Sequence, residues 1–253
     1  MILEIDAGNT RAKWRLTTAE LPAPQAGVVL MQGDPLTDAL NVTRSVAGRG
    51  VRRIDAVRVS NVRGKAFEHC LREAVGDEWQ LIPEFPQPVK ECAGVVNGYE
   101  DPAKLGVDRW LAMLAAYRRA GRGCCVVDCG TTITVDLISD TGIHQGGYIV
   151  PGLVMMKTML ERQSPVLKWE IHQRAATVPG RNTAEAINHG ALAMVAGLID
   201  RAITSAAEKV GIPALFLTGG DGMVVQQCLD RQSFYESELV LDGLQLACIA
   251  HGG

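Results

Sequence analysis

The sequence lacks the features that mark nucleic-acid-binding and membrane-spanning proteins. Its 25 lysines and arginines are outnumbered by 28 aspartates and glutamates, so the formal net charge is −3 and no basic excess exists to hold a nucleic-acid backbone. No run of 18 apolar residues is long enough to span a membrane, and no basic segment precedes the first apolar run. We therefore expect neither a nucleic acid nor a membrane as a partner.

The cysteines also lack the spacing of a disulfide framework or a zinc site. They number seven, which is odd, and no Cys-x-x-Cys pair occurs. Cys124, Cys125 and Cys129 lie in or beside an apolar run, where cysteine acts as a small hydrophobic residue. We expect a reduced, cytoplasmic protein, and 253 residues are enough for one large domain or two small ones.

The chain does contain a short sequence motif that occurs twice. The residues Asp6-Ala7-Gly8-Asn9-Thr10 close one apolar run, and Asp128-Cys129-Gly130-Thr131-Thr132 close another. Each copy predicts a buried strand, a tight turn at glycine whose amides suit a phosphate, and a returning strand. Two copies that grip a polyphosphate from both sides predict a nucleotide phosphotransferase.

The predicted elements repeat in the two halves as three strands followed by alternating helix and strand. We expect strands over residues 2–6, 11–17, 27–31, 55–59, 124–127, 133–138, 142–150 and 214–218, and helices over 65–75, 107–120, 153–162, 183–211 and 242–250. Loops are expected over 21–25, 83–88 and 164–180. The glycines at 121 and 123 place the boundary between domains 1–121 and 122–253, so the sequence predicts duplicated α/β domains with an interdomain cleft.

The two repeated aspartates are candidate cation ligands. A carboxylate repels phosphate, so Asp6 would hold Mg²⁺ that bridges to the phosphates, and Asp128 would hold a second cation. The alternative is that each aspartate caps its own turn, but the repetition favours a site. Lys13 could reach a phosphate as a point charge, and a solvated strand face is an equally good interpretation.

Three further segments contain residues suited to substrate binding or catalysis. In Gly106-Val107-Asp108-Arg109, the carboxylate can accept a hydroxyl proton and the guanidinium can bind a carboxylate, although Asp108 could simply cap the helix. The small residues of Leu217-Thr218-Gly219-Gly220-Asp221 would let an adenosine ring approach the backbone. Asn97-Gly98-Tyr99 predicts a turn that projects an aromatic hydroxyl. The glycines of 146–147 indicate either a close backbone approach or a bulge, and no histidine is assigned to catalysis.

In these motifs the chain resembles the type III pantothenate kinase family of the actin, sugar kinase and Hsp70 ATPase superfamily, whose two domains are ribonuclease H-like. The resemblance covers nearly the whole chain and includes both phosphate turns, the Gly-x-Asp-Arg segment and the Pro151-Gly152 element. One departure is Thr132, where the family more often has alanine.

The resemblance implies phosphorylation of pantothenate to 4′-phosphopantothenate by ATP with Mg²⁺, the first step of coenzyme A biosynthesis. It implies that Asp108 is the general base and that the pantothenate site contains Tyr99, Gly106, Val107, Asp108, Arg109 and Thr183. It places ATP against Asp6, Ala7, Gly8, Asn9, Thr10, Arg11, Ala12, Lys13 and Thr131, puts K⁺ or NH4⁺ at Asp128, and implies a homodimer. A kinase of another small alcohol and a nucleotide-dependent regulatory protein of the same fold are the alternatives.

Overall fold

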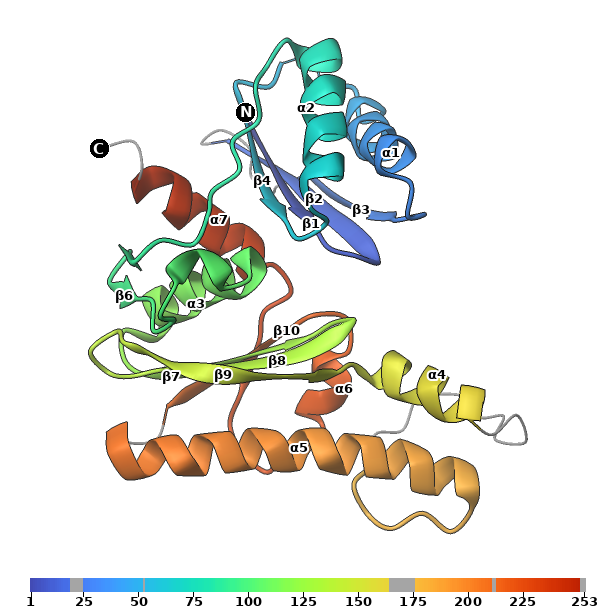
Figure 1. The fold of residues 1–253 in the computed structure, drawn as a ribbon, viewed down its shortest axis with the longest axis vertical. Coiled ribbons are helices and arrows are strands. Elements are labelled where there is room, and N and C mark those ends of the chain that lie inside the picture. The colour runs from blue at the N-terminus through green and yellow to red at the C-terminus, as the bar shows by residue number, and fades with distance from the viewer. Residues whose placement is uncertain (19–24, 52, 164–175, 211–212, 251–253) are drawn as a thin grey trace. The chain divides into compact units, whose positions relative to one another are not determined.

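The computed structural model describes residues 1–18, 25–51, 53–163, 176–210 and 213–250 (Figure 1). The chain forms two compact units. Unit 1 comprises Met1–Ala93, Asp101–Ala115 and Val240–Gly253, and unit 2 comprises Gly94–Glu100 and Ala116–Leu239. These units differ from the predicted domains 1–121 and 122–253 because the chain passes between them more than once. The boundary between the duplicated halves stays a prediction.

The sheet of unit 1 consists of β1 (Ile2–Ala7), β2 (Arg11–Thr17), β3 (Gln25–Leu30) and β4 (Ala56–Asn61). The strand order is β3-β2-β1-β4. β1 pairs antiparallel with β2 and parallel with β4, and β2 pairs antiparallel with β3. The carboxyl ends of β1, β3 and β4 therefore meet at one edge of the sheet.

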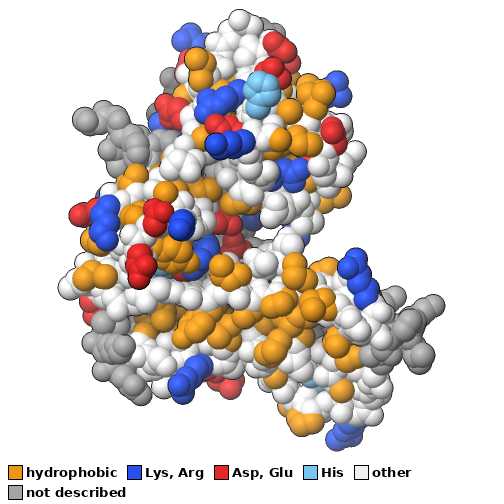
Figure 2. Space-filling model, viewed as in Figure 1, with side chains coloured by type: hydrophobic (Ala, Val, Ile, Leu, Met, Phe, Trp, Pro, Cys, Tyr) orange, Lys and Arg blue, Asp and Glu red, His pale blue; other side chains and the backbone are white. Residues whose placement is uncertain are grey.

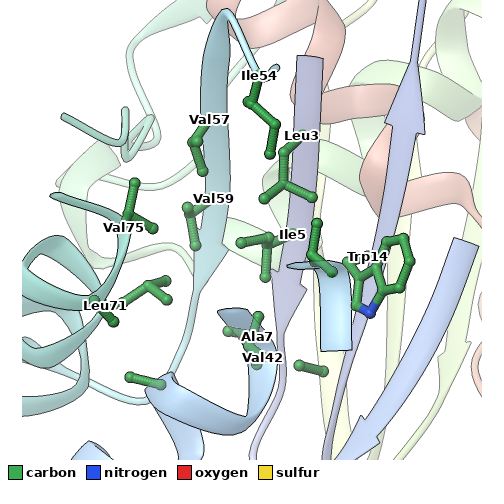
Figure 3. Packing of buried hydrophobic residues seen from close by; sticks show 14 of the residues in the cluster. Leu3, Ile5, Ala7, Trp14, Val42, Ile54, Val57, Val59, Leu71 and Val75 are labelled. Carbon is green, nitrogen blue, oxygen red and sulfur yellow. The ribbon is translucent and has the colours of Figure 1, made fainter. Parts of the chain in front are cut away.

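Helices α1 (Pro35–Ala47) and α2 (Lys65–Trp79) lie side by side on one face of this sheet (Figure 1). Alternate strand residues supply the core there, because successive side chains of a strand point to opposite faces. Figure 3 shows Leu3, Ile5 and Val59 pointing toward the helices, and these side chains are fully buried. Trp14 belongs to the same cluster, as its alternation with Ala12 and Leu16 predicts.

The chain continues through the short strands β5 (Glu91–Cys92) and β6 (Val95–Val96), the 3₁₀ turn η1 (Pro102–Lys104) and helix α3 (Val107–Ala120). The sheet of unit 2 follows, with β7 (Cys124–Cys129), β8 (Thr132–Ile138), β9 (His144–Pro151), β10 (Ala214–Thr218) and β11 (Phe234–Tyr235). Its helices are α4 (Leu153–Gln163), α5 (Thr183–Val210) and α6 (Gly222–Gln226), and α7 (Leu239–Ala250) ends the described chain. In Figure 1, α5 runs along one face of this sheet.

The two sheets share one topology. In unit 2, β7 pairs antiparallel with β8 and parallel with β10, and β8 pairs antiparallel with β9. The strand order β11-β10-β7-β8-β9 thus repeats the arrangement of unit 1, with β11 added at the edge. The predicted duplicated α/β architecture is confirmed at the level of strand order, and no helix in the described residues is long and apolar enough to cross a membrane.

Most predicted elements agree with the observed ones to within a few residues. Arg11–Thr17 and Ala214–Thr218 are strands with the predicted bounds. The strand predicted over 27–31 begins two residues earlier and ends one residue earlier, so Gln25 belongs to it and not to a loop, and the final helix begins at Leu239 instead of 242. Residues 21–24, 164–175 and 211 of the predicted loops and helix lie outside the described residues, whereas 83–88 forms no helix or named strand.

Glycine in β9 has a local cause. The pairing of β8 with β9 shifts register between Asp136 and Ile138, which leaves an additional residue on β9. Gly146 lies in this irregularity with a φ of 93°, a conformation that favours glycine. Of the two interpretations of this glycine-rich strand, the bulge is therefore the observed one.

The other face of the unit 1 sheet carries polar side chains, two of which form a buried ion pair. Glu4 on β1 and Arg15 on β2 are opposite each other in register, and the Arg15 Nε donates to the Glu4 carboxylate at 2.5 Å. Arg15 also donates to Asp242 at the start of α7 at 2.7 Å. Burial raises the pKa of Glu4, although the positive charge of Arg15 opposes that rise. This ion pair ties the last helix of the chain to the first two strands.

Replacing Arg15 with methionine is expected to lower the free energy of unfolding by about 3–5 kcal/mol, because Glu4 would remain buried without its main counter-charge. Urea denaturation at pH 7 measures the loss. Arg53→Met is the matched control, since its ion pair with Asp55 is exposed; it should change stability by less than about 1 kcal/mol. An equal effect of the two substitutions would contradict the role of the buried pair.

Candidate functional site

In unit 1, three polar side chains lie at the carboxyl end of β1. Asp6 is opposite Lys13 of β2 and beside Ser60 of β4 in strand register. Residues paired in register share a face of the sheet, so these side chains project together, away from the apolar core. Lys13 is only partly exposed, and its contact with a phosphate stays a prediction.

The carboxyl of Asp6 is unusually hard to ionise. Burial raises its pKa from 3.8 to about 6, and the negative charge of Asp108 adds to the rise. The positive charge of Lys13 works in the opposite direction without cancelling it. The ionised form of Asp6 is therefore disfavoured mainly by burial and further by a second negative charge. A divalent cation bound at Asp6 would offset both effects, so a carboxylate in this position is compatible with the predicted Mg²⁺ site.

Asp108 is held in place by its own segment. It lies in the first turn of α3, and the backbone N–H of Arg109 donates to its Oδ1 at 2.8 Å. A Cβ placed on Gly106 would stand only 2.8 Å from that oxygen, so glycine leaves the room that the carboxylate occupies. Arg109 is buried, with side-chain carbons beside the same glycine. Val107, the first residue of α3, is also buried.

The first phosphate turn follows Asp6. The backbone N–H of Gly8 donates to the carbonyl of Arg11 at 3.1 Å, which closes the turn between β1 and β2. Asn9, Thr10 and Arg11 are exposed, whereas Ala7 and Ala12 are buried on the core face. Of the residues predicted to contact ATP, those of the turn are thus exposed, and Asp6 and Lys13 are partly exposed.

The second turn, in unit 2, has a different neighbourhood. Asp128 is opposite Thr134 of β8 and beside Thr218 of β10 in register. Gly219, with a φ of 85°, packs so tightly that an added Cβ would lie 2.5 Å from the Asp128 Oδ1. Glycine at position 219 therefore allows the Leu217–Asp221 segment to pack against the turn that follows Asp128.

Pro151-Gly152 packs directly on the second turn. A Cβ at Gly152 would lie 2.3 Å from the carbonyl oxygen of Gly130 and 2.5 Å from that of Thr131. The Gly152 N–H donates to the Thr131 carbonyl at 3.1 Å, and α4 begins at the next residue. The Thr131 and Thr132 side chains remain exposed at the turn.

Tyr99 contacts Asn97 of its own predicted turn and also His144, which the sequence analysis did not select. Its backbone N–H donates to the Asn97 side chain at 3.0 Å, which confirms the predicted turn. Its ring stacks on that of His144, with centroids 5.9 Å apart, and the buried His144 Nε2 lies 3.0 Å from Asp136. No short motif joins His144 to Tyr99, because β9 and the Asn97 turn are more than 40 residues apart in sequence.

Thr183 is exposed in the first turn of α5. Asn182 makes the capping bond, since its Oδ1 accepts from the Glu185 N–H at 2.9 Å, so Asn182 and not Thr183 caps the helix. At the junction between β10 and α6, Asp221 is the N-cap residue of α6 without a side-chain capping bond.

The structure brings together part of the predicted site within each unit. Asp6, Lys13 and Asp108 are close in unit 1, and Asp128 and Thr131 flank one turn in unit 2. Tyr99 and Thr183 belong to other parts of unit 2. Among the described residues there is no group of three or more His, Cys, Asp or Glu side chains that could hold a metal ion. The assignment of each residue to a ligand stays a prediction.

Comparison with known proteins identifies similar chains. The family model described as type III pantothenate kinase matches residues 2–205. The type III pantothenate kinase of Pseudomonas putida (strain W619) is 34% identical over 253 residues, covering 98% of this chain and 99% of the relative.

Solved structures share the fold. A Campylobacter jejuni protein assigned to the Baf family of transcriptional activators has a TM-score of 0.62 and 22% identity, with 99% of this chain and 98% of that chain covered. A ROK family glucokinase from Streptomyces griseus, solved with glucose and AMPPNP, has a TM-score of 0.50 and 12% identity, with 100% and 99% covered. At these identities the likeness establishes the actin-like ATPase and sugar kinase fold alone.

Removing the charge of Asp6 is expected to stabilise the ligand-free protein in a pH-dependent way. Because the folded-state pKa is raised, the wild type loses stability as the pH rises from about 4 through about 6. Asp6→Asn should therefore be the more stable protein at pH 8, by at most about 3 kcal/mol, and lose most of that advantage at pH 4.5.

Thermal unfolding at the two pH values, without nucleotide or Mg²⁺, measures the difference. The exposed Asp77→Asn serves as the control for charge alone. A stabilisation by Asp6→Asn that is the same at both pH values, or a loss at pH 8, would contradict the burial of an unfavourable charge.

Proposed function

The chain belongs to the type III pantothenate kinase family, and we propose that it transfers the γ-phosphoryl group of ATP to the hydroxyl of pantothenate. The product is 4′-phosphopantothenate, and the reaction is the first step of coenzyme A biosynthesis. The observation that carries this proposal is the match to that family over nearly the whole chain. Asp108 lies near enough to Asp6 for its charge to raise the pKa of Asp6.

Asp108 is the proposed general base. A phosphoryl group passes through a loose transition state, so the hydroxyl proton leaves late and a carboxylate is sufficient to accept it. The Oδ1 of Asp108 accepts from the Arg109 N–H at 2.8 Å, which helps to orient the carboxyl group at the start of α3. Gly106 keeps the space that this orientation requires.

Arg109 is the proposed partner of the pantothenate carboxylate. The Arg109 side chain is buried, and a guanidinium can bind a carboxylate through two parallel hydrogen bonds. Because Asp108 and Arg109 are adjacent at the start of α3, one helix would present the base and orient the substrate. Tyr99, Gly106, Val107 and Thr183 complete the proposed pantothenate site.

Asp6 and the turn that follows it are the proposed ATP-phosphate site. The exposed residues Asn9, Thr10 and Arg11 offer amides and a positive charge, and Lys13 adds a point charge beside Asp6. Mg²⁺ bound near Asp6 would neutralise charge on the phosphates. Thr131 of the second turn is a further proposed ATP contact, and Asp128 is the proposed ligand of K⁺ or NH4⁺.

We propose a cytoplasmic homodimer. Large hydrophobic side chains are exposed on consecutive elements of unit 2, among them Ile149 of β9 at 60% and Met159 of α4 at 57%. Hydrophobic side chains gather over unit 2 on the face that Figure 2 shows. Exposed apolar surface of this kind is typical of a protein–protein interface, and a second copy of the chain is the proposed partner.

The proposal is tested by ATP turnover with pantothenate and with a panel of other small alcohols, with and without K⁺. We expect turnover that depends on pantothenate and rises with K⁺. ATP hydrolysis that is independent of pantothenate, or no turnover with any alcohol, would favour a nucleotide-dependent regulatory protein. Preference for another alcohol would reassign the substrate.

Asp108→Asn is expected to lower kcat by at least about a hundredfold, because the amide cannot accept the hydroxyl proton. The substitution preserves size, so the circular-dichroism spectrum and the melting temperature should stay close to those of the wild type. Steady-state kinetics with saturating ATP and pantothenate measure kcat. Near wild-type turnover in the folded variant would remove Asp108 from the role of base.

A further inference from the structure

Arg63 is a residue outside every motif, yet it contacts the first phosphate turn. It lies between β4 and α2, and its Nη1 donates to the Asn9 carbonyl at 2.9 Å. A longer contact of 3.5 Å reaches the Gly8 carbonyl. The guanidinium also lies 5.1 Å from the centroid of the Phe67 ring, and its side chain is 9% exposed. A nearly buried arginine is thus attached to the backbone of the turn.

The carboxylate that holds Arg63 is Asp38 of α1, which is fully buried. Its Oδ1 accepts from the Gln32 N–H at 2.7 Å and its Oδ2 from the Gly33 N–H at 3.0 Å, and Oδ2 also forms an ion pair with the Arg63 Nη2. Asp38 therefore joins the loop after β3 to the loop after β4.

These contacts lie where the carboxyl ends of β1, β3 and β4 meet. The Met31 N–H donates to the Thr10 carbonyl at 3.0 Å, so the loop after β3 also contacts the turn directly. Three segments far apart in sequence, around residues 9, 32 and 63, are consequently joined by one buried ion pair and a few backbone bonds.

The bond to Asn9 has a geometric consequence for the turn. The described chain contains no cis peptide, and in a trans peptide the carbonyl and the following N–H point in opposite directions. Because Arg63 holds the Asn9 carbonyl on its own side, the Thr10 N–H is directed away from Arg63. Asn9 and Thr10 are both exposed, so the turn that Arg63 holds lies at the surface of unit 1.

The charge of Arg63 is balanced by Asp38, so the pair adds little net charge to the turn. Lys13 differs, because its positive charge acts on Asp6 itself. An effect of Arg63 on a bound phosphate would accordingly come through the orientation of backbone amides and not through long-range attraction.

We propose that Arg63, held by Asp38, is a positioning residue that fixes the turn 8–10 in the conformation that binds the phosphates of ATP. This inference rests on the proposed role of that turn in ATP binding. It assigns to Arg63 and Asp38 no contact with pantothenate.

The test uses Arg63→Lys, which keeps the positive charge and most of the side-chain length. An ammonium cannot reproduce the fixed fork with which arginine reaches Asp38 and the Asn9 carbonyl together. We expect the KM for ATP to rise at least about tenfold while the KM for pantothenate changes less than about twofold. Arg63→Met combined with Asp38→Asn is the second variant, which has no charge at either position and should show the same selective rise.

The matched control is Arg72→Met. Arg72 lies 4.5 Å from the centroid of the Phe85 ring, pairs with Glu68 and donates to the Pro83 carbonyl, so it has the same kinds of contact without touching the turn. Its substitution should leave both KM values within about twofold of the wild type. Circular dichroism confirms that each variant is folded before its kinetics are compared.

Calorimetric titration with ATP and Mg²⁺ separates this inference from the proposed function, because it needs no pantothenate. If the wild type binds ATP but does not phosphorylate pantothenate, the proposed function fails while a weaker ATP affinity of Arg63→Lys still supports the positioning role. An ATP affinity and KM within twofold of the wild type in the folded Arg63→Lys would overturn it. An equal rise in the KM values for both substrates would overturn it as well.

Discussion

The parallel pairing of the first strand with a later strand is the constraint on which both units depend. In unit 1 it places the end of β1 beside the end of β4, and in unit 2 it places the end of β7 beside the end of β10. An aspartate at such an end is flanked by a strand on each side, which limits its access to water. For Asp6 the consequence is a raised pKa, and a carboxylate of this kind is suited to sharing a cation with a ligand.

The two aspartate turns are equivalent in topology and different in chemistry. Asp6 has Lys13 opposite it in register, whereas Asp128 has Thr134. Asp6 is also influenced by Asp108, while Asp128 is packed against Gly219. Duplication therefore preserved the strand-turn-strand framework, and the neighbouring side chains now distinguish the proposed Mg²⁺–phosphate side from the proposed monovalent-cation side.

Several glycines of the motifs have a steric explanation that the linear sequence does not contain. Gly106 leaves room for the carboxylate of Asp108, and Gly152 leaves room for the carbonyls of the second turn. In each case an added Cβ would stand closer than 3.0 Å to the neighbouring oxygen. Glycine at these positions thus allows the close approaches between segments that orient the polar groups of the candidate site.

By itself the sequence determined the local structure and the chemical types at the site. Alternation over Arg11–Thr17 and the apolar run at Ala214–Thr218 specify strands, and the repeated Asp-x-Gly phrase specifies two turns, because these signals depend on residues near one another in the chain. Only the tertiary structure decided which distant residues support them. His144 stacks on Tyr99, Arg63 and Asp38 hold the first turn, and α7 joins unit 1 through Asp242 and Arg15. Those partners come from strands and helices tens or hundreds of residues apart, and a single sequence carries no periodic signal for such contacts.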